Sequence, residues 1–250
     1  MFYQQIVKWI FIISCALMIA LYFYKDKLPE PSTYEAFNLE EPLQTPTFRE
    51  PFSIETNHQH YSLTPKFDYD LTGVVVSYSN ADGFTNIWHH DLWKDFINVR
   101  DICVIWGKNV STGVYKEVDF TSDSWTCWYT LTSKKSSMQF KSTAFSNNHL
   151  LVDNTFLASA LLKAEIGDVV HFKGILVDYT NDENGGVRHT STHRRDTGNG
   201  ACEVVYLDDF TVIKKANPIL RNFYMLTKWA AIFSFLGFVV LFVITPFEPR

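Results

Sequence analysis

The chain lacks the short motifs that identify many enzymes. It has no C-x-x-C pair, no H-E-x-x-H and no G-x-S-x-G, so zinc-ribbon, zincin and serine-hydrolase signatures are all missing. Residues 196–198 (DTG) match the tripeptide of aspartic proteases, but two arginines precede them and no second D-[ST]-G supplies a facing carboxylate. The sequence therefore predicts neither a metal nor any other cofactor.

Basic charge is also scarce. The 250 residues carry 22 Lys and Arg against 27 Asp and Glu, a net charge of −5. Non-specific nucleic-acid binding needs a basic groove that releases counterions from the phosphates. Nucleic acid is therefore a disfavoured partner.

Cysteine is sparse, with four residues in the chain. Cys15 lies within an apolar run, which leaves Cys103, Cys127 and Cys202. An odd number keeps two arrangements open: one pair could form a disulfide in an oxidising compartment, or all three could be free thiols in a reducing one.

Two long apolar runs are present, at residues 6–24 and 227–247, between short tails at 1–5 and 248–250. A helix of about 20 apolar residues crosses a bilayer. No small-residue cleavage site follows the first run, so we expect an uncleaved anchor instead of a signal peptide. The sequence predicts two membrane spans, with the bilayer and other membrane or membrane-proximal proteins as partners.

The side of the membrane is less clearly marked. A basic segment at 214–226 adjoins the second run, and the cations facing the central region are Lys25, Lys27, Lys214, Lys215, Arg221 and Lys228. The outer flanks carry Lys8 and Arg250. Because Lys and Arg accumulate on the cytoplasmic side, the count favours a cytoplasmic domain, and a periplasmic one stays open because the intervening segment is long.

Residues 25–65 are rich in proline and acidic residues and poor in aliphatic ones. Such composition is typical of an extended, semi-rigid linker. We expect these residues to be a spacer between the membrane and a β-rich domain at 66–213.

The domain shows five β-branched runs, which predict strands at 69–79, 102–107, 125–131, 168–179 and 202–213. Helical spacing predicts helices at 86–99 and after a cap at Asp153 or Asn154. Apart from the first helix, this order of three strands, a helix and two strands is that of a small OB-like β-barrel, with a sandwich as the alternative. The helix at 86–99, with Trp88, His89, His90 and Trp93, would be an insertion between strands one and two.

Residues 180–201 would then connect the last two strands, where OB-folds bind ligands. The candidate ligand-binding residues are Arg188, His189, His193, Arg194, Arg195, Asp196 and Glu203. The arginines suit a phosphate or carboxylate. A purely structural loop, pinned by Asp196 with Arg194 or Arg195, is the alternative. A metal site from His189, His193 and Asp196, with Glu203, is a weaker one because zinc needs a defined tetrahedron of ligands.

Three stretches carry a resemblance: SNNHLL at 146–151, GDVVHFKGILVDY at 167–179 and TSTHRRDTGNGACEVVYLDDFTVI at 190–213. Together they resemble a group of bacterial membrane-anchored proteins without an established activity. The resemblance implies a bacterial inner membrane and assigns no functional residue. The polar group Asn147, Asn148 and His149 could line the mouth of the domain or form a turn before the second helix.

These observations favour a membrane-anchored binding or assembly module with the 180–201 loop as its recognition surface. Two alternatives remain. One is an enzyme that uses His189, His193, Asp196 and Glu203 for metal-dependent or acid/base chemistry. The other is a structural subunit whose helices pack on partner proteins.

Overall fold

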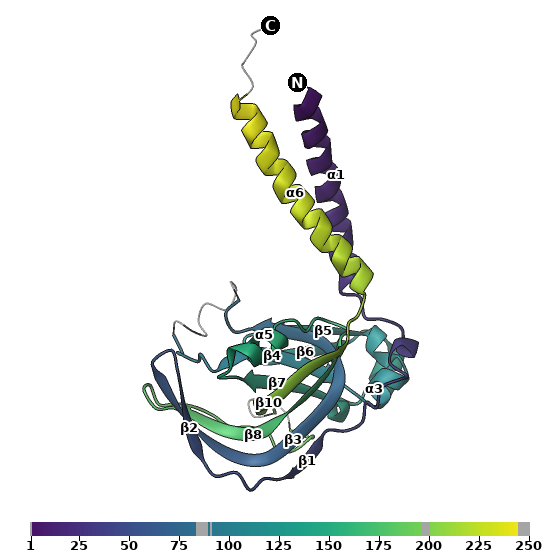
Figure 1. The fold of residues 1–250 in the computed structure, drawn as a ribbon. Coiled ribbons are helices and arrows are strands. Elements are labelled where there is room, and N and C mark those ends of the chain that lie inside the picture. Colours follow the sequence, from purple (N-terminus) through teal and green to yellow (C-terminus); the bar gives the residue numbers. More distant parts are fainter. Residues whose placement is uncertain (1, 84–89, 91, 197–200, 245–250) are drawn as a thin grey trace. The chain divides into compact units, whose positions relative to one another are not determined.

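The computed structural model describes residues 2–83, 90, 92–196 and 201–244, which fall into two units. One unit holds residues 1–27 and 217–250, and the other is Leu28–Ala216. Outside the two terminal helices the protein is mainly sheet (Figure 1).

The first unit consists of helices α1 (Phe2–Lys25) and α6 (Pro218–Ile244), both long and apolar enough to cross a membrane. They pack antiparallel, with Phe11 and Phe235 rings 5.8 Å apart and Gln4 Nε2 donating to the Leu241 carbonyl at 3.2 Å. The two apolar runs of the sequence are thus confirmed as long helices, and residues 245–247 of the second run lie outside the described residues.

The second unit contains an eight-stranded sheet and a separate hairpin. The sheet comprises β1 (Leu43–Pro46), β2 (Phe52–Thr56), β3 (Gln59–Asn80), β4 (Asn98–Ile105), β7 (Phe145–Leu151), β8 (Val169–Asn181), β9 (Gly186–Arg188) and β10 (Glu203–Lys214). The hairpin pairs β5 (Val118–Asp123) with β6 (Thr126–Leu131). The short helical segments are η1 (Pro31–Thr33), α3 (Lys108–Ser111), η2 (Val114–Glu117), α4 (Lys134–Gln139), η3 (Ser142–Ala144) and α5 (Thr155–Leu161).

Five strands of the sheet, namely β3, β4, β7, β8 and β10, pair only with one another in a closed ring of neighbours, apart from the short strands added at the edges. β3 pairs antiparallel with β4 and β8, β4 with β7, and β8 with β10, whereas β7 and β10 are parallel. In Figure 1, β3 and β8 curve together along the domain. Register shifts in β3 at Pro65/Phe67 and Val75/Ser77 accompany this curvature, because an extra residue in one strand bends it.

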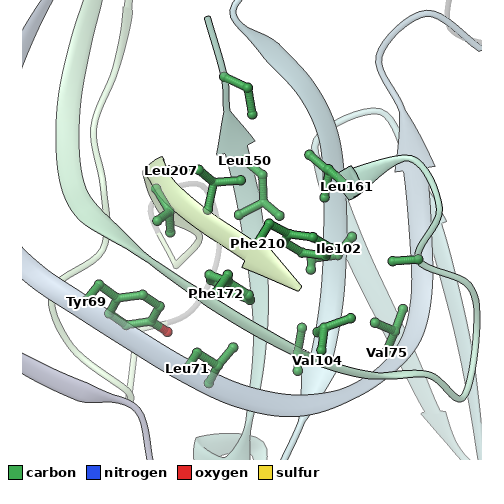
Figure 2. Close-up of a cluster of buried hydrophobic side chains, with 14 of the residues drawn as sticks. Tyr69, Leu71, Val75, Ile102, Val104, Leu150, Leu161, Phe172, Leu207 and Phe210 are labelled. Carbon is green, nitrogen blue, oxygen red and sulfur yellow. The ribbon is translucent and has the colours of Figure 1, made fainter. Parts of the chain in front are cut away.

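The main hydrophobic core lies on one face of these strands. Leu71, Val104, Phe172 and Phe210 are all nearly or completely buried, and Leu161 of α5 covers one end (Figure 2). Alternate residues point the opposite way, so Cys103 and Ile105 join a second cluster. Because both faces are covered, these strands read as continuous apolar runs instead of alternating ones.

The segment 25–65 is not the extended spacer that its composition predicts. It contributes β1 and β2, both paired with β3, and belongs to the same unit as the rest of the sheet. Asn57 and His58 form the β2–β3 turn with φ of 55° and 60°, the positive values that suit tight hairpins. Composition alone hid a short hairpin among prolines and carboxylates.

Along the chain, β7 is the third of the five strands in the closed ring, and it lies in a stretch for which the sequence suggested only polar mouth residues or a turn. Its amides and imidazole are buried and hydrogen-bonded, so polar residues here do not mark solvent. Residues 125–131 do form a strand, β6, but it pairs with β5 in the separate hairpin.

The two predicted helices fare differently. The second is confirmed as α5, where the Asn154 side chain accepts from the backbone N–H of Phe156 at 2.8 Å. For the first, at 86–99, residues 86–89 and 91, including Trp88 and His89, lie outside the described residues. Its predicted end is wrong, because Asn98 and Val99 belong to β4.

Candidate functional site

Four polar side chains meet where β4, β7 and the start of β10 lie side by side. Asp101 on β4 is the cross-strand partner of His149 on β7, and His149 in turn pairs with Val204 on β10. Asn147 lies two residues before His149 and therefore on the same face. Cys202 immediately precedes β10 and reaches this group.

His149 and Asp101 form a buried pair. The imidazole Nδ1 lies 2.7 Å from Asp101 Oδ1, and the two side chains are only 0% and 5% exposed. Asn98 Nδ2 donates to the same carboxylate oxygen at 2.9 Å. Among the described residues, the other ring nitrogen, Nε2, is buried without a hydrogen-bond partner. A buried nitrogen without a hydrogen bond destabilises the folded protein, unless a ligand or a neighbouring group bonds to it.

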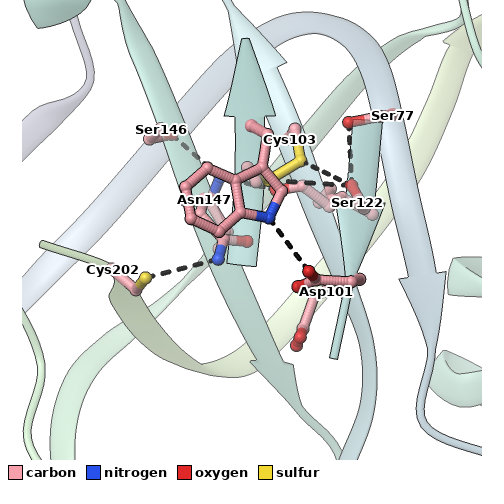
Figure 3. Close-up of a disulfide and its surroundings, with 12 residues drawn as sticks. Ser77, Asp101, Cys103, Ser122, Ser146, Asn147 and Cys202 are labelled. Atoms are coloured by element: carbon pink, nitrogen blue, oxygen red, sulfur yellow. Dashed lines mark hydrogen bonds between the residues drawn. A yellow bond between two sulfur atoms is a disulfide. The ribbon is translucent and has the colours of Figure 1, made fainter. Parts of the chain in front are cut away.

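Cys202 is a half-buried free thiol beside this pair. Asn147 Nδ2 donates to its Sγ at 3.3 Å (Figure 3). The Trp125 carbonyl lies 3.8 Å from Sγ. The same amide also donates to the Trp125 carbonyl at 2.9 Å. The other two cysteines of the domain, Cys103 and Cys127, are joined in a disulfide that tethers β4 to the β5–β6 hairpin.

The pKa of His149 reflects these neighbours. Burial lowers it, but the Asp101 carboxylate and the Cys202 thiol more than offset burial and raise the pKa to about 9. The imidazole is thus favoured in its charged form at neutral pH. Thiol, imidazole and carboxylate follow one another in the order that activates a nucleophile.

A cavity of about 490 Å³ lies next to this group. Its lining comes from the connection before β4, the β5–β6 turn, the end of β8, the following turn and β9: Leu92, Trp93, Asp95, Trp125, Tyr179, Asn181, Asn184, Gly186, Val187 and Arg188. Asp95 accepts a hydrogen bond from the Tyr179 hydroxyl at 2.7 Å. The lining combines aromatic surface with a few polar groups, as small-molecule sites do.

Trp125 forms a shared wall between the cavity and His149. Its ring centroid lies 5.3 Å from that of Trp93 and 5.4 Å from that of His149. The backbone φ of Trp125 is 73°, a value that a bulky residue rarely adopts. Strain of this kind costs about 1–3 kcal/mol and clusters at functional sites.

Arg188 lies on the cavity side of Trp125, with its guanidinium carbon 3.6 Å from the ring centroid. Within the described part of the chain, no carboxylate or other acceptor hydrogen-bonds to this guanidinium. A half-buried arginine over an aromatic ring can donate several hydrogen bonds to a ligand in the cavity.

The other residues of the predicted loop site do not converge on the cavity. His189 is 74% exposed and lies 3.1 Å from Asp178, and His193 and Arg195 are also exposed. Asp196 accepts from the Ser191 hydroxyl at 2.9 Å and does not pair with either neighbouring arginine. The segment 189–196 thus interacts mainly with the sheet, for example with Asp178 of β8, and not with the cavity.

Arg194 and Glu203 form a separate buried ion pair, in which Arg194 also donates to Gln44 Oε1 at 3.3 Å. Burial raises the pKa of Glu203, Arg194 opposes that effect, and the pKa settles at about 7. Arg194 and Glu203 were both candidate ligand-binding residues. In the structure they pair with each other, so Arg194 is not available to bind an anion.

The metal alternative gains no support from this geometry. Across the described residues, no three His, Cys, Asp or Glu side chains are grouped to hold an ion; His189 lies against Asp178, whereas Asp196 accepts from Ser191. Residues 197–200, including Gly198 and Gly200, lie outside the described residues.

Sequence reasoning missed Asp101, Trp125 and the role of Cys202. The available signal was a polar residue beside an apolar run, because Asp101 directly precedes ICVI in β4 and His149 directly precedes the two leucines of β7. A polar side chain that is buried in the sheet needs a hydrogen-bond partner. Polar residues on two neighbouring strands can therefore be expected to pair with each other.

No known protein family, curated protein or solved structure matches this chain.

Proposed function

We propose that the protein is a membrane-anchored binding module that recognises an anionic small molecule in the cavity beside Trp125. Arg188 carries this proposal, since its guanidinium is stacked on an indole, faces the cavity and has no acceptor among the described residues. The aromatic and apolar lining suits the non-polar part of the same ligand. A carboxylate or phosphate would complete the arginine fork.

The strand pairings support an OB-like barrel as the scaffold. The sequence of neighbours β3–β4–β7–β10–β8 returns to β3, and α5 lies between the third and fourth of these strands along the chain. In OB-folds the connections between strands one and two and between strands four and five form the binding mouth. Here those connections supply Trp93 and Arg188, which both line the cavity and lie against Trp125.

The disulfide bears on the side of the membrane. The Lys and Arg count around α1 and α6 favours the cytoplasm, but that rule weakens across long segments. A Cys103–Cys127 disulfide persists in oxidising compartments and is rare in the cytosol. The proposal therefore has α1 and α6 anchor the domain on the extracytoplasmic side.

Calorimetric titration of the detergent-purified full chain tests the anion site. N-acetylphenylalanine and phenyl phosphate are suitable probes, because each joins an aromatic ring to an anion. We expect Arg188→Ala to weaken binding at least tenfold, since a charge-assisted bidentate contact contributes about 1.5–3 kcal/mol.

Arg195→Ala is the matched control, because it removes the same charge from an exposed position outside the cavity. Equal affinity of the wild type and Arg188→Ala for both probes, or no binding of either probe to the wild type, would refute an anion site at Arg188.

A further inference from the structure

The group Asp101, His149 and Cys202 has features that a structural role does not explain. A hydrogen bond between Nδ1 and Asp101 would hold the ring in place, but it leaves Nε2 buried without a partner among the described residues. The side chain of Cys202 interacts with this imidazole and raises its pKa. In the Ser-His-Asp triad, Nε2 takes the proton of the nucleophile while Nδ1 is held by the carboxylate, and Cys–His pairs activate a thiol by the same logic.

Two neighbours fix the position of the Cys202 side chain. The Asn147 amide donates to Sγ at 3.3 Å, and the Cys202 S–H donates to the Trp125 carbonyl at 3.8 Å. Cys202 is the only free cysteine among the described residues of the domain, because Cys103 and Cys127 are bonded to each other. It is half-buried, so a substrate can reach it without the domain opening.

The cavity adjoins this group through a single residue. Trp125 presents its ring to the cavity and its carbonyl to Sγ, and the edge of its ring contacts His149. A molecule anchored on Arg188 therefore has Trp125 between its anionic end and the thiol.

We propose that Cys202 is the nucleophile of an acyl-transfer site, with His149 as its proton acceptor and Asp101 as a positioning residue. Its substrate class is an amide or ester that carries an anionic group. The substrate class rests on the proposed anion site at Arg188, whereas the nucleophile assignment stands on Asp101, His149 and Cys202 alone.

The chemistry balances without a cofactor. Because the pKa of His149 is about 9, the neutral imidazole is the minor form at pH 7, and it is this form that reacts. In it, the Cys202 proton passes to Nε2 as sulfur bonds to the carbonyl carbon. The bond from that carbon to the leaving nitrogen or oxygen then breaks, and His149 returns the proton to the departing amine or alcohol. Water attacks the resulting thioester, the carbon–sulfur bond breaks, and the acid is released with the thiol restored. Asp101 stabilises the imidazolium at each stage.

An activated ester provides the test. Detergent-purified full chain carrying Cys15→Ser, which removes the other free cysteine, is mixed with p-nitrophenyl acetate. We expect a burst of about one equivalent of p-nitrophenolate and an acetyl group on Cys202 by mass spectrometry. His149→Gln should slow acylation about a hundredfold, as loss of a general base does.

Two further measurements keep the test decisive if His149→Gln unfolds. Asp101→Asn should slow acylation and change its pH profile, whereas Arg195→Ala should do neither. Acylation of the folded chain no faster than that of the same chain in denaturant would overturn the proposal. Acylation of His149→Gln and Asp101→Asn as fast as that of the wild type would also overturn it. A mixed disulfide with glutathione in place of an acyl-enzyme would also overturn it, in favour of a redox thiol.

The substrate class is tested separately with mono(p-nitrophenyl) succinate, which adds a carboxylate to the ester. The wild type should prefer this ester over p-nitrophenyl acetate, and Arg188→Ala should lower that preference at least tenfold. Acylation of Cys202 without any such preference would refute the anion site and leave the nucleophile assignment standing.

Discussion

Burial lowers the pKa of a histidine, and a neighbouring carboxylate raises it. His149 is completely buried, yet Asp101 and Cys202 raise its pKa above the usual value of 6.5 to about 9. Protons are therefore bound more tightly by the folded protein than by the unfolded chain between these two values. The contribution to stability is complete below about pH 6.5 and is lost as pH rises through about 9.

We therefore expect the domain to lose stability between pH 7 and pH 9.5, by up to roughly 3 kcal/mol at about 1.4 kcal/mol per pKa unit. Chemical denaturation of the wild type and His149→Gln at both pH values measures the effect. The variant should show a smaller decrease over this range. The same decrease in both proteins would mean that His149 is not the group responsible.

Arg194 and Arg195 are adjacent in sequence but differ in burial. Arg194→Ala leaves Glu203 buried without its cation, so we expect a loss of about 2–4 kcal/mol in the free energy of unfolding. Glu203→Gln in the same chain should restore part of it by removing the uncompensated charge. Arg195→Ala is expected to change stability by less than about 0.5 kcal/mol, and equal losses from both arginines would contradict the ion pair.

Strands and helices were predictable wherever a local pattern decides the structure. The β-branched runs of β3, β4, β8 and β10 and the Asn154 cap of α5 were recognisable because burial and capping act over a few residues. β7 was not, because its polar residues are satisfied by β4, more than forty positions earlier in the chain. The pairing of β1 and β2 with β3 was hidden for a different reason, because prolines and carboxylates in residues 25–65 mask a local hairpin.

Close packing of β8 on β10 is one feature that no sequence pattern reveals. A Cβ added at Gly174 would lie 2.1 Å from the Tyr206 carbonyl oxygen, a backbone atom of the neighbouring strand. We expect Gly174→Ala to separate the two strands and lower the midpoint of thermal unfolding by several degrees. Gly186→Ala is the control, since its Cβ would meet only the flexible Asn184 side chain. Similar midpoints for both variants would disprove the tight contact.

At the scale of the whole molecule, hydropathy sufficed for the two long helices, but the candidate site did not emerge from the sequence. Arg188 was identified by its charge. Asp101 on β4, His149 on β7 and Cys202 just before β10 meet only when the sheet forms. The loop residues that looked most like chemistry, His189 and His193, are exposed on the surface.

The disulfide yields a prediction for the intact protein in cells. If the domain is extracytoplasmic, Cys103 and Cys127 should resist maleimide labelling until a reductant is added. Replacing both by serine should lower the free energy of unfolding by about 3 kcal/mol, the value for a loop of this size, because the unfolded chain gains freedom. Full labelling before reduction would mean that the domain faces a reducing compartment.

The pairing of β3 with β8 has a consequence for how the protein is made. Tyr61 pairs with Asn181 and Val74 with Val169, so one edge of a 22-residue strand waits for partners that are synthesised much later. Until then that edge is an open template for other chains. Such non-local pairing slows folding and exposes the nascent chain to aggregation. We expect the unfinished chain to depend on chaperones up to the moment at which β8 emerges and covers β3.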